Sequence, residues 1–300
     1  MNIDIAVIGA GPAGIAAAVQ LKRFDLDPRV FEKNRIGGLL WNAHWIENYP
    51  GFPAGISGAR LAGLFENHLE TFHIPVIADT IISLDYPPGQ ERFLLTTASG
   101  DHTADFVIVA SGTVPTTAGI IDIVPKELAR YVVFDIFPLL GLPGKNIVIV
   151  GGGDIAFDYA LHLSQFQGNH ITLVLRSEKV TALPLLARRV RDTANICLVS
   201  SATIQKVEKG NTYPLRLTFE KNGAAVVFDA DILVGAIGRV PHSDFFSPRL
   251  CKMEEQLMTG GHLHKIGDVK NGRFRQAAIA AGNGIKAAMK IYEYKNRGNR

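Results

Sequence analysis

The sequence predicts an α/β protein built from two copies of one strand, glycine turn and helix plan, with the second copy inserted within the first. The apolar segment at residues 3–8 runs directly into a glycine-rich turn at residues 9–14. Residues 147–150 run in the same way into a second turn at residues 151–156. A helical pattern of apolar residues follows each turn, and this alternation of strand and helix is typical of parallel sheets.

A second repeated element marks where one domain ends and the other resumes. Residues 105–112 match residues 231–238 in register, since each segment starts with an acid, continues as a buried strand and ends at a glycine. A proline follows each segment, at Pro115 and Pro241, and indicates a loop that leaves the sheet. The predicted domains are therefore residues 1–115 together with 244–300, and residues 116–243.

The first turn has the spacing of a dinucleotide-binding motif. Gly9 allows a tight turn, Gly11 lets a pyrophosphate approach the backbone, and Gly14 permits close packing of strand and helix. The helix that follows offers free N–H groups and the positive end of its dipole to the phosphates. Glu32 ends the next apolar run, 18 residues after Gly14, where its carboxylate would accept both hydroxyls of an adenosine ribose.

In the second turn the same three roles fall to Gly151, Gly153 and Ala156. The next strand, residues 171–175, ends in Arg176 and Ser177 instead of an acid. A cation with a hydroxyl suits the 2′-phosphate of NADP and therefore favours NADP over NAD. Glu178 follows directly and leaves NAD open.

The composition is that of an ordinary globular protein. Of the 300 residues, 47% are hydrophobic and 20% are charged, which excludes disorder, collagen-like repeats and a coiled coil. The net charge of +3 gives no indication of a nucleic-acid partner. The two cysteines, Cys197 and Cys251, do not form a CxxC, so a zinc ribbon and a local redox pair are excluded. We also expect no metal site, because the close pair His262 and His264 has no third ligand nearby.

We expect no segment that crosses a membrane. The amino-terminal segment is apolar but carries Asp4 and lacks a basic region, unlike a signal peptide. The longest uncharged stretch, residues 106–121, is interrupted by polar residues and proline and is too short to span a bilayer. These features predict a cytoplasmic protein.

Taken together and in this order, the motifs resemble those of the thioredoxin-reductase-like flavoproteins, over essentially the whole chain. The matching segments are Gly9-x-Gly11-Pro-Ala-Gly14, Gly37-Gly-Leu-Leu40, Ile46-Glu-Asn-Tyr-Pro-Gly-Phe-Pro53, Gly55-Ile-Ser-Gly58, Gly151-Gly-Gly-Asp-Ile-Ala156, Ile266-Gly-Asp-Val269 and Arg275-Gln-Ala277. The resemblance implies two Rossmann-like domains, with FAD in the first and NADPH or NADH in the second, NADP being favoured. It also implies a homodimer.

The resemblance assigns roles to residues outside the glycine turns. It implies that Asp268 binds the ribityl chain or pyrophosphate region of the flavin, and that Gln276 and Ala277 face the isoalloxazine ring. Asn48 is expected beside that ring or, alternatively, as a turn-forming residue before Tyr-Pro-Gly. The residues expected to bind FAD are Gly9, Gly11, Pro12, Ala13, Gly14, Glu32, Lys33, Gly38, Leu39, Asn48, Gly112, Gly267, Asp268, Gln276 and Ala277. The residues expected to bind NAD(P) are Gly151, Gly153, Asp154, Ile155, Ala156, Arg176 and Ser177.

The chain departs from the family at the redox-active CxxC, which precedes the second glycine turn. Residues 134–137 occupy that position and read Phe-Asp-Ile-Phe. Dithiol–disulfide exchange needs one thiolate to attack and a second thiol to resolve the mixed disulfide. We therefore expect no catalytic side chain and no reduction of thioredoxin, with the flavin carrying the chemistry.

The cationic run that binds NADPH in the family is also reduced. Arg176 is the one cation that remains of three, and Thr181 stands at the last position of the run. The nearby arginines at residues 188–191 are candidate replacements for the lost cations, or else form a basic helix face.

The segment after Gly37 and Gly38 is apolar and aromatic. Leu39 stands where many family members have Gln, so a polar contact to the flavin becomes apolar. The aromatic residues that follow it are Trp41, His44 and Trp45. They either stack a planar acceptor such as a quinone, with a histidine as proton donor, or pack under the loop at residues 46–53.

Two classes of function fit these observations. We favour an FAD-dependent oxidoreductase that passes electrons between NAD(P)H and a non-disulfide acceptor, such as ferredoxin, flavodoxin or a quinone. The alternative is a flavoprotein without NAD(P)H activity, either reduced by a protein electron donor or serving as a non-catalytic FAD-binding sensor or assembly protein. The reduced cationic run supports the alternative, and the intact second glycine turn supports the oxidoreductase.

Overall fold

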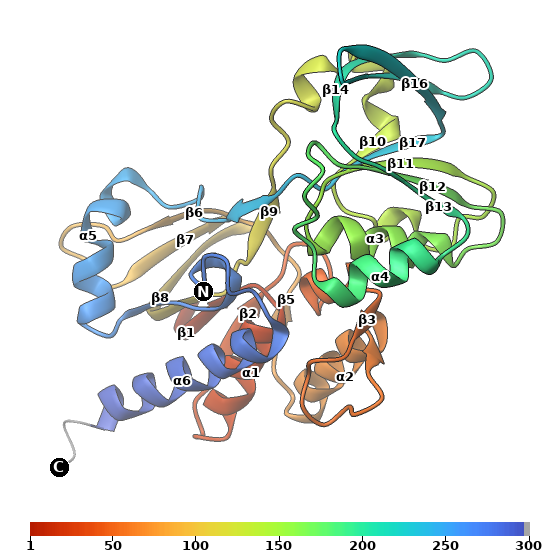
Figure 1. Ribbon diagram of the computed structural model, residues 1–300. Helices are drawn as coiled ribbons and strands as arrows, with labels where there is room; N and C mark the ends of the chain where they lie inside the picture. Colours follow the sequence, from red (N-terminus) through yellow and green to blue (C-terminus); the bar gives the residue numbers. More distant parts are fainter. Residues whose placement is uncertain (297–300) are drawn as a thin grey trace. The chain divides into compact units, whose positions relative to one another are not determined.

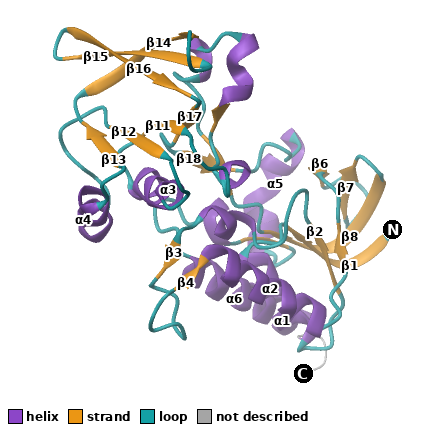
Figure 2. Ribbon diagram, turned by 90° about the vertical axis from the view of Figure 1, so that its right-hand side faces the viewer, coloured by secondary structure: helices purple, strands orange, loops and turns teal. Residues whose placement is uncertain are grey.

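The computed structural model describes residues 1–296, which divide into two compact units (Figures 1 and 2). Unit 1 contains Met1–Trp41, Ile46–Val114 and the residues from Pro241 onwards, and unit 2 contains Asn42–Trp45 and Pro115–Val240. Residues 297–300 of the first predicted domain lie outside the described range. Residues 42–45 fold with unit 2, although the predicted first domain includes them.

Unit 1 is organised around a seven-stranded sheet in the order β5-β2-β1-β8-β7-β6, with β19 also paired to β8. Its strands are β1 (Asn2–Ile8), β2 (Pro28–Phe31), β5 (Val76–Ile77), β6 (Ile81–Asp85), β7 (Phe93–Thr97), β8 (Gly100–Val109) and β19 (Leu263–Lys265). The strands β5, β2, β1, β8 and β19 run parallel, and β7 and β6 extend the sheet in antiparallel fashion. The run of apolar residues in β1 is buried, as expected for a central parallel strand that is covered on both faces.

The helices of unit 1 are α1 (Pro12–Lys22), α2 (Gly58–Thr71), α5 (Pro248–Thr259) and α6 (Ala277–Asn296). Its shorter elements are β4 (Ile56–Ser57) and the 3₁₀ turn η5 (Gly267–Val269), while η1 (Gly38–Asn42) and β3 (Trp45–Ile46) extend over the boundary with unit 2. The helices α1 and α6 lie side by side (Figures 1 and 2). A Cβ atom on Gly284 of α6 would lie 2.2 Å from the carbonyl oxygen of Ala13, so this approach requires glycine.

Unit 2 contains a parallel five-stranded sheet in the order β10-β17-β11-β12-β13. Its strands are β10 (Val132–Val133), β11 (Asn146–Val150), β12 (His170–Val174), β13 (Ile196–Val199) and β17 (Ile232–Gly235). An antiparallel three-stranded sheet is formed by β14 (Ala202–Lys209), β15 (Leu215–Lys221) and β16 (Ala224–Ala230). The helices are α3 (Asp154–Ser164) and α4 (Pro184–Asp192), and the 3₁₀ turns are η2 (Ile121–Ile123), η3 (Lys126–Tyr131) and η4 (Phe137–Leu139).

The two faces of the parallel sheet in unit 2 carry separate cores. Ile147 and Ile149 of β11 pack in the cluster that includes α3 and α4. Val148, which points the opposite way, packs in the cluster that includes the antiparallel sheet. Figure 1 shows the corresponding layers, with α3 and α4 below the sheet and β14–β16 above it.

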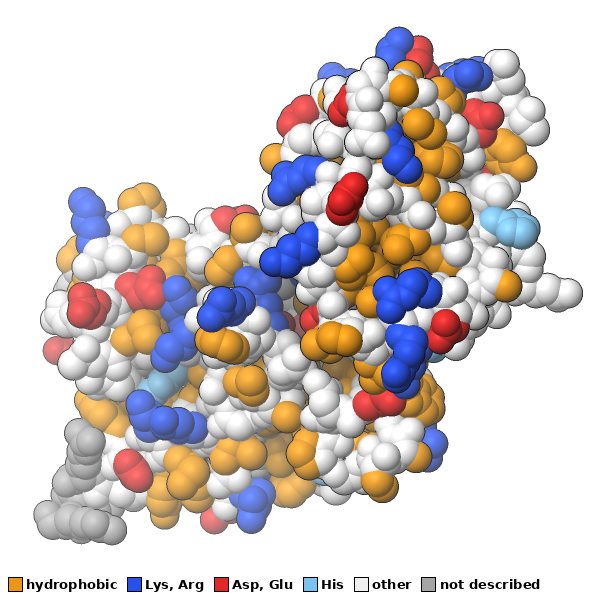
Figure 3. Space-filling model, viewed as in Figure 1, with side chains coloured by type: hydrophobic (Ala, Val, Ile, Leu, Met, Phe, Trp, Pro, Cys, Tyr) orange, Lys and Arg blue, Asp and Glu red, His pale blue; other side chains and the backbone are white. Residues whose placement is uncertain are grey.

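The connections between the units, β9 (Thr113–Pro115) and β18 (Arg239–Pro241), pair as a two-stranded sheet. In each unit a parallel strand leads through a glycine turn into a helix, and this arrangement confirms the predicted α/β class with two Rossmann-like units. Within residues 1–296, the structure has no helix whose length and apolar character would let it cross a membrane. On the face in Figure 3, basic and acidic side chains are interspersed, in keeping with the small net charge of +3.

Candidate nucleotide-binding sites

The first glycine turn is shaped so that a phosphate can approach its backbone. Gly9 has a φ of +104°, and a Cβ atom there would lie 2.5 Å from the carbonyl oxygen of Ala110. A Cβ atom on Gly14 would lie 1.9 Å from the carbonyl oxygen of Gly9. Among the described residues, apart from chain neighbours, no atom lies within 4 Å of the Cβ position of Gly11, and no side chain caps α1 there. The turn therefore offers open space and backbone N–H groups to a pyrophosphate.

Glu32 lies directly after β2 and is fixed beside this turn. One oxygen of its carboxylate accepts the N–H of Ala10 at 2.8 Å, and the other accepts the N–H of Asn34 at 2.9 Å. Each carboxylate oxygen has a further lone pair for a ribose hydroxyl. The structure thus places Glu32 beside the turn, and its role in ribose binding stays a prediction.

The start of η1 packs against the same turn. The N–H of Gly37 donates to the carbonyl oxygen of Ala10 at 2.7 Å. A Cβ atom on Gly38 would lie 3.4 Å from the Cα of Gly11. Leu39 is 36% exposed, so an apolar side chain is available at this edge of the predicted FAD site.

The carboxyl-terminal part of unit 1 supplies further predicted FAD residues. Gly267 has a φ of +67°, and a Cβ atom there would lie 2.8 Å from the Cβ of Ala13, so η5 with Asp268 contacts the first turn of α1. The side-chain amide of Asn48 donates to Oε1 of Gln276 at 2.6 Å. This bond joins Asn48 to the residue that precedes α6. The remaining predicted FAD residues lie at the ends of elements, namely Pro12 and Ala13 in α1, Lys33 after β2, Gly112 after β8 and Ala277 in α6.

Two residues of the predicted aromatic acceptor patch, Trp41 and His44, have contacts in the structure. Nε1 of Trp41 donates to the carbonyl oxygen of Ile36 at 2.7 Å, and the Arg35 guanidinium lies 4.5 Å from the centre of its ring. His44 belongs to unit 2, where its ring nitrogen lies 2.6 Å from the amide nitrogen of Gln165. The acceptor role of these residues and packing under the loop at residues 46–53 both stay predictions.

The second glycine turn has the same form with one substitution. A Cβ atom on Gly151 would lie 2.3 Å from the carbonyl oxygen of Ala236. The Cβ position of Gly153 lies in open space among the described residues, and no side chain caps the amino end of α3. Ala156 is fully buried, and its methyl group occupies the third motif position. Ile155 is 38% exposed at the entrance to the helix.

The loop between β12 and α4 folds over this second turn. The N–H and the hydroxyl of Thr181 both donate to the carbonyl oxygen of Gly152, at 3.2 and 2.8 Å. The N–H of Leu183 donates to Oδ1 of Asp154 at 2.7 Å. Thr181 therefore anchors the loop at the position where the family places its last cation.

Arg176 and Ser177 lie exposed at the carboxyl end of β12. The Ser177 hydroxyl donates to the carbonyl oxygen of Lys179 at 3.2 Å. The carboxyl end of this strand is where the adenosine ribose binds in a Rossmann plan. The NADP-binding role of Arg176 and Ser177 stays a prediction.

A polar network lies at residues 134–137, the predicted position of the family's CxxC. Oδ1 of Asp135 accepts from Nη1 of Arg239 at 2.6 Å. The same oxygen accepts from the Tyr159 hydroxyl and from Nδ2 of Asn42, each at 3.2 Å. Burial, with the Asp135 carboxylate as the next cause, raises the pKa of Tyr159. Residues 134–137 thus form a structural corner without a thiol.

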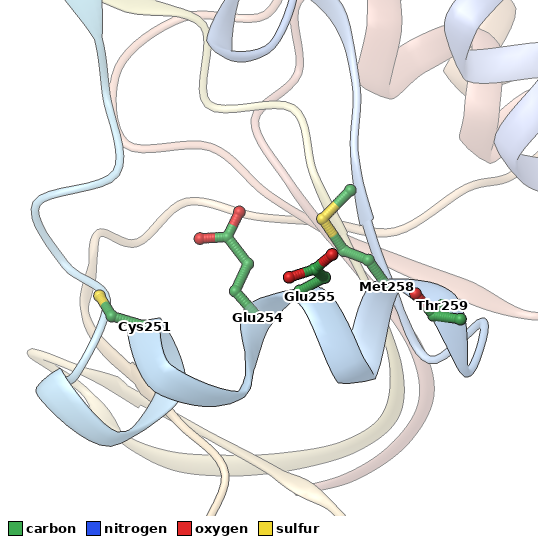
Figure 4. A pocket seen from close by; sticks show the side chains of 5 residues that line it. All are labelled: Cys251, Glu254, Glu255, Met258 and Thr259. Atoms are coloured by element: carbon green, nitrogen blue, oxygen red, sulfur yellow. The ribbon is translucent and has the colours of Figure 1, made fainter.

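Neither cysteine restores a redox pair. Cys197 lies on β13 of unit 2 and Cys251 on α5 of unit 1, and both are free and exposed. Figure 4 shows the open hollow of about 540 Å³ on α5 that Cys251 lines together with Glu254, Glu255, Met258 and Thr259. None of the predicted nucleotide-binding residues lines this hollow. Within residues 1–296, no group of three or more His, Cys, Asp or Glu side chains is placed to hold a metal ion.

Sequence reasoning missed a polar stripe on α3. Asp158 and His162 lie one turn apart on this helix, whose other strongly polar residues, Asp154 and Ser164, are at its two ends. Burial raises the pKa of Asp158 to about 6, an effect opposed by the hydrogen bond from the N–H of His44 and reinforced by the charge of Asp154. Burial also lowers the pKa of His162. Two polar residues at i and i+4 within a mostly apolar helical pattern are the sequence signal that could have indicated this stripe.

Comparison with known proteins identifies the family. Residues 3–284 match the family model described as pyridine nucleotide-disulphide oxidoreductase. A thioredoxin reductase of Streptomyces clavuligerus is 31% identical over 97% of this chain and 93% of its own length, and that of Neurospora crassa is 28% identical over 96% and 92%. The crystal structure of Lactococcus lactis thioredoxin reductase (FR conformation) has a TM-score of 0.84 at 22% identity, covering 97% of this chain and 98% of that one.

These findings confirm the resemblance seen in the motifs. The thioredoxin reductase family uses FAD and NADPH, and the open glycine turns, with Glu32 fixed beside the first, fit those two groups. Bound FAD would supply the electron transfer, and the residues predicted above would bind and orient it. The chain is therefore an FAD-dependent NAD(P)H oxidoreductase and belongs to the pyridine nucleotide-disulphide oxidoreductase family.

Proposed function

We propose that this oxidoreductase passes electrons from NAD(P)H to an acceptor that is not a disulfide. One observation supports the proposal above all others. At the position of the family's CxxC, residues 134–137 contain no cysteine, and the Asp135 carboxylate is bonded to Arg239, Tyr159 and Asn42. Reduction of thioredoxin through a protein dithiol would need an attacking and a resolving thiol there. The acceptors that remain are one-electron carriers, such as a ferredoxin or a flavodoxin, and quinones.

The two cysteines present do not replace that pair. Cys197 and Cys251 lie in different units, and neither has the other cysteine as a sequence neighbour. Either cysteine alone lacks the second protein thiol that resolves a mixed disulfide in the dithiol route. The double variant Cys197→Ser with Cys251→Ser is therefore expected to keep full activity with the true acceptor.

The test begins with the purified flavoprotein under anaerobic conditions. Mixing with NADPH and, separately, with NADH is expected to bleach the flavin absorbance, which identifies the nucleotide that donates electrons. The oxidised acceptors are then offered one at a time: a ferredoxin, a flavodoxin, menadione, and thioredoxin coupled to insulin reduction. We expect turnover with one of the first three and none with thioredoxin. Thioredoxin reduction that the double cysteine variant abolishes would overturn the proposal.

We also propose a cytoplasmic homodimer. The resemblance to the thioredoxin-reductase-like flavoproteins supports this assignment. Analytical ultracentrifugation of the flavin-loaded protein checks the oligomeric state, since a sedimenting mass equal to that of one chain would contradict the dimer.

A further inference from the structure

A four-residue segment of the amino-terminal region folds with the other unit. Residues Asn42–Trp45, which we call the strap, belong to unit 2, although the chain on both sides of them, Met1–Trp41 and Ile46–Val114, belongs to unit 1. A short segment leaves its neighbours in this way only if specific contacts compensate for the lost conformational freedom.

Asn42 makes the first set of those contacts. Its side chain is only 7% exposed. Nδ2 donates to Oδ1 of Asp135 at 3.2 Å, and Oδ1 accepts the N–H of Phe137 at 2.9 Å. The carbonyl oxygen of Asn42 also lies 3.2 Å from Nδ1 of His162. The side-chain amide of Asn42 therefore donates one hydrogen bond to the segment at residues 134–137 and accepts another from it. A shorter or apolar side chain would lose both bonds.

His44 makes the second set, along α3. Its backbone N–H donates to Oδ2 of Asp158 at 3.0 Å, and its ring Nε2 lies 2.6 Å from Nε2 of Gln165. Its ring centre lies 5.4 Å from that of His162. Asp158, His162 and Gln165 are spaced i, i+4 and i+7, so they form one stripe that runs along a single face of the helix.

The strap connects two elements with predicted cofactor roles. The helix that the strap contacts, α3, begins at Asp154 in the second glycine turn, where the nicotinamide nucleotide is predicted to bind. The segment that precedes the strap, Gly37–Trp41, is bonded to the first glycine turn through the N–H of Gly37 and the carbonyl oxygen of Ala10. The strap is therefore the covalent and hydrogen-bonded continuation of a predicted FAD-binding segment.

We propose that Asp135 and Asp158 are positioning residues, which fix the strap on unit 2 and thereby hold the segment Gly37–Trp41 in the conformation that binds FAD. The proposal rests on the predicted contact of Gly38 and Leu39 with FAD and does not depend on the identity of the electron acceptor. Neither carboxylate touches the reacting atoms in this role.

The burial of Asp158 supports a positioning role over a purely stabilising one. A buried carboxylate is costly, because it loses hydration that one hydrogen bond does not replace. The groups that face it are His44, His162, Tyr159 and the carboxylate of Asp154. None of these groups is a fixed cation. Among these groups, it is thus the hydrogen bond from the His44 N–H that favours the charged form of Asp158.

The chain carries its own reporter for this segment. Trp41 and Trp45, which flank the strap residues Asn42–His44, are its two tryptophans. The test uses the FAD-loaded protein and compares Asn42→Ala, Asp158→Ala and Asp158→Asn with the wild type. The control is Asp229→Ala, which removes an exposed carboxylate of the same unit on β16. Three quantities are measured: tryptophan emission, hydrogen exchange of residues 38–46, and the rate of FAD release on dilution, followed by flavin fluorescence.

We expect Asn42→Ala and Asp158→Ala to shift the emission to longer wavelength, to speed exchange of residues 38–46, and to release FAD about tenfold faster. Asp158→Asn is expected to keep the tryptophan emission and the FAD release rate of the wild type, because its amide oxygen still accepts the His44 N–H. Asp229→Ala is expected to change nothing. Should Asp158→Ala fail to fold, Asn42→Ala decides alone, since it lies outside the helix. Wild-type FAD release and emission in Asn42→Ala would overturn the proposal.

Discussion

At the third position of the glycine motif, the first turn has Gly14 and the second has Ala156. A Cβ atom on Gly14 would lie 1.9 Å from the carbonyl oxygen of Gly9, whereas the methyl group of Ala156 is accommodated and buried. The first turn is further confined by Gly284 of α6, whose Cβ position is 2.2 Å from the Ala13 carbonyl oxygen. The third motif position is therefore more confined in the first turn than in the second.

The helices that follow these two turns also differ, in the polarity of the side chains that contact the rest of the unit. The buried face of α1 consists of Ala, Gly, Ile and Leu, and it packs against α6 of its own unit. The corresponding helix α3 carries Asp158 and His162, which bind the strap. A helix that only supports one cofactor can be apolar, whereas a helix that also holds a segment from elsewhere in the chain needs polar side chains at matched spacing.

The largest effect is expected from adding one methyl group to the first turn. Gly14→Ala forces the backbone of Gly9 to move and is expected to lower FAD affinity by at least about 100-fold. Ala156→Gly in the other turn removes a methyl group and is expected to leave FAD binding unchanged. The FAD content of the purified proteins, from the ratio of flavin to protein absorbance, checks both. The control Gly63→Ala adds a methyl group in open space on α2. Equal FAD loss in Ala156→Gly would break the contrast between the turns.

The next largest effect is expected in the pH dependence of the free energy of unfolding, to which α3 contributes through Asp158. The folded-state pKa of Asp158 is raised from 3.8 to about 6, so the folded protein holds this proton more tightly than the unfolded chain. Its stabilising contribution is present below about pH 3.8 and is lost as the pH rises through about 6. Asp158→Asn removes this dependence and is expected to exceed wild-type stability at pH 8 by about 2–3 kcal/mol, with little difference near pH 4.

Thermal unfolding of the flavin-loaded protein between pH 4 and 8 measures this difference. A stability gap between Asp158→Asn and wild type that stays constant over the range would show that the carboxyl group does not titrate there. His102→Gln serves as a control, because burial lowers the pKa of that histidine in unit 1 and its titration gives the opposite trend.

The contrast between the two turns also shows what the sequence can predict. The turns, their strands and Glu32 follow from local patterns, because glycine spacing and apolar periodicity are set by the backbone geometry of each element. The strap does not, since the bonds from Asn42 to Asp135 and from His44 to Asp158 join residues 93 and 114 positions apart. Such pairings depend on the tertiary fold, and no local periodicity in the sequence predicts them.

A smaller effect is expected at the carboxylate beside the first turn. Glu32→Ala removes the acceptor for the N–H groups of Ala10 and Asn34 and for the predicted ribose hydroxyls, and is expected to weaken FAD binding about 30-fold. Glu32→Gln keeps one acceptor oxygen and is expected to fall between Ala and wild type. FAD dissociation constants from flavin fluorescence titration give the order. An affinity of Glu32→Ala equal to wild type would remove Glu32 from the site.

The smallest effect is expected at the equivalent place beyond the second turn. Arg176 is exposed and lies at the end of β12, so its contribution to a 2′-phosphate is screened by water. Arg176→Ala is expected to raise the dissociation constant of NADPH about tenfold and to leave that of NADH nearly unchanged, because only NADPH carries the 2′-phosphate. Lys179→Ala removes a neighbouring cation and is the matched control. Stopped-flow bleaching of the flavin over a range of nucleotide concentrations gives both constants. Equal losses for NADPH and NADH would mean that Arg176 contacts a part common to both nucleotides, and the preference for NADP would then have to come from the arginines of α4.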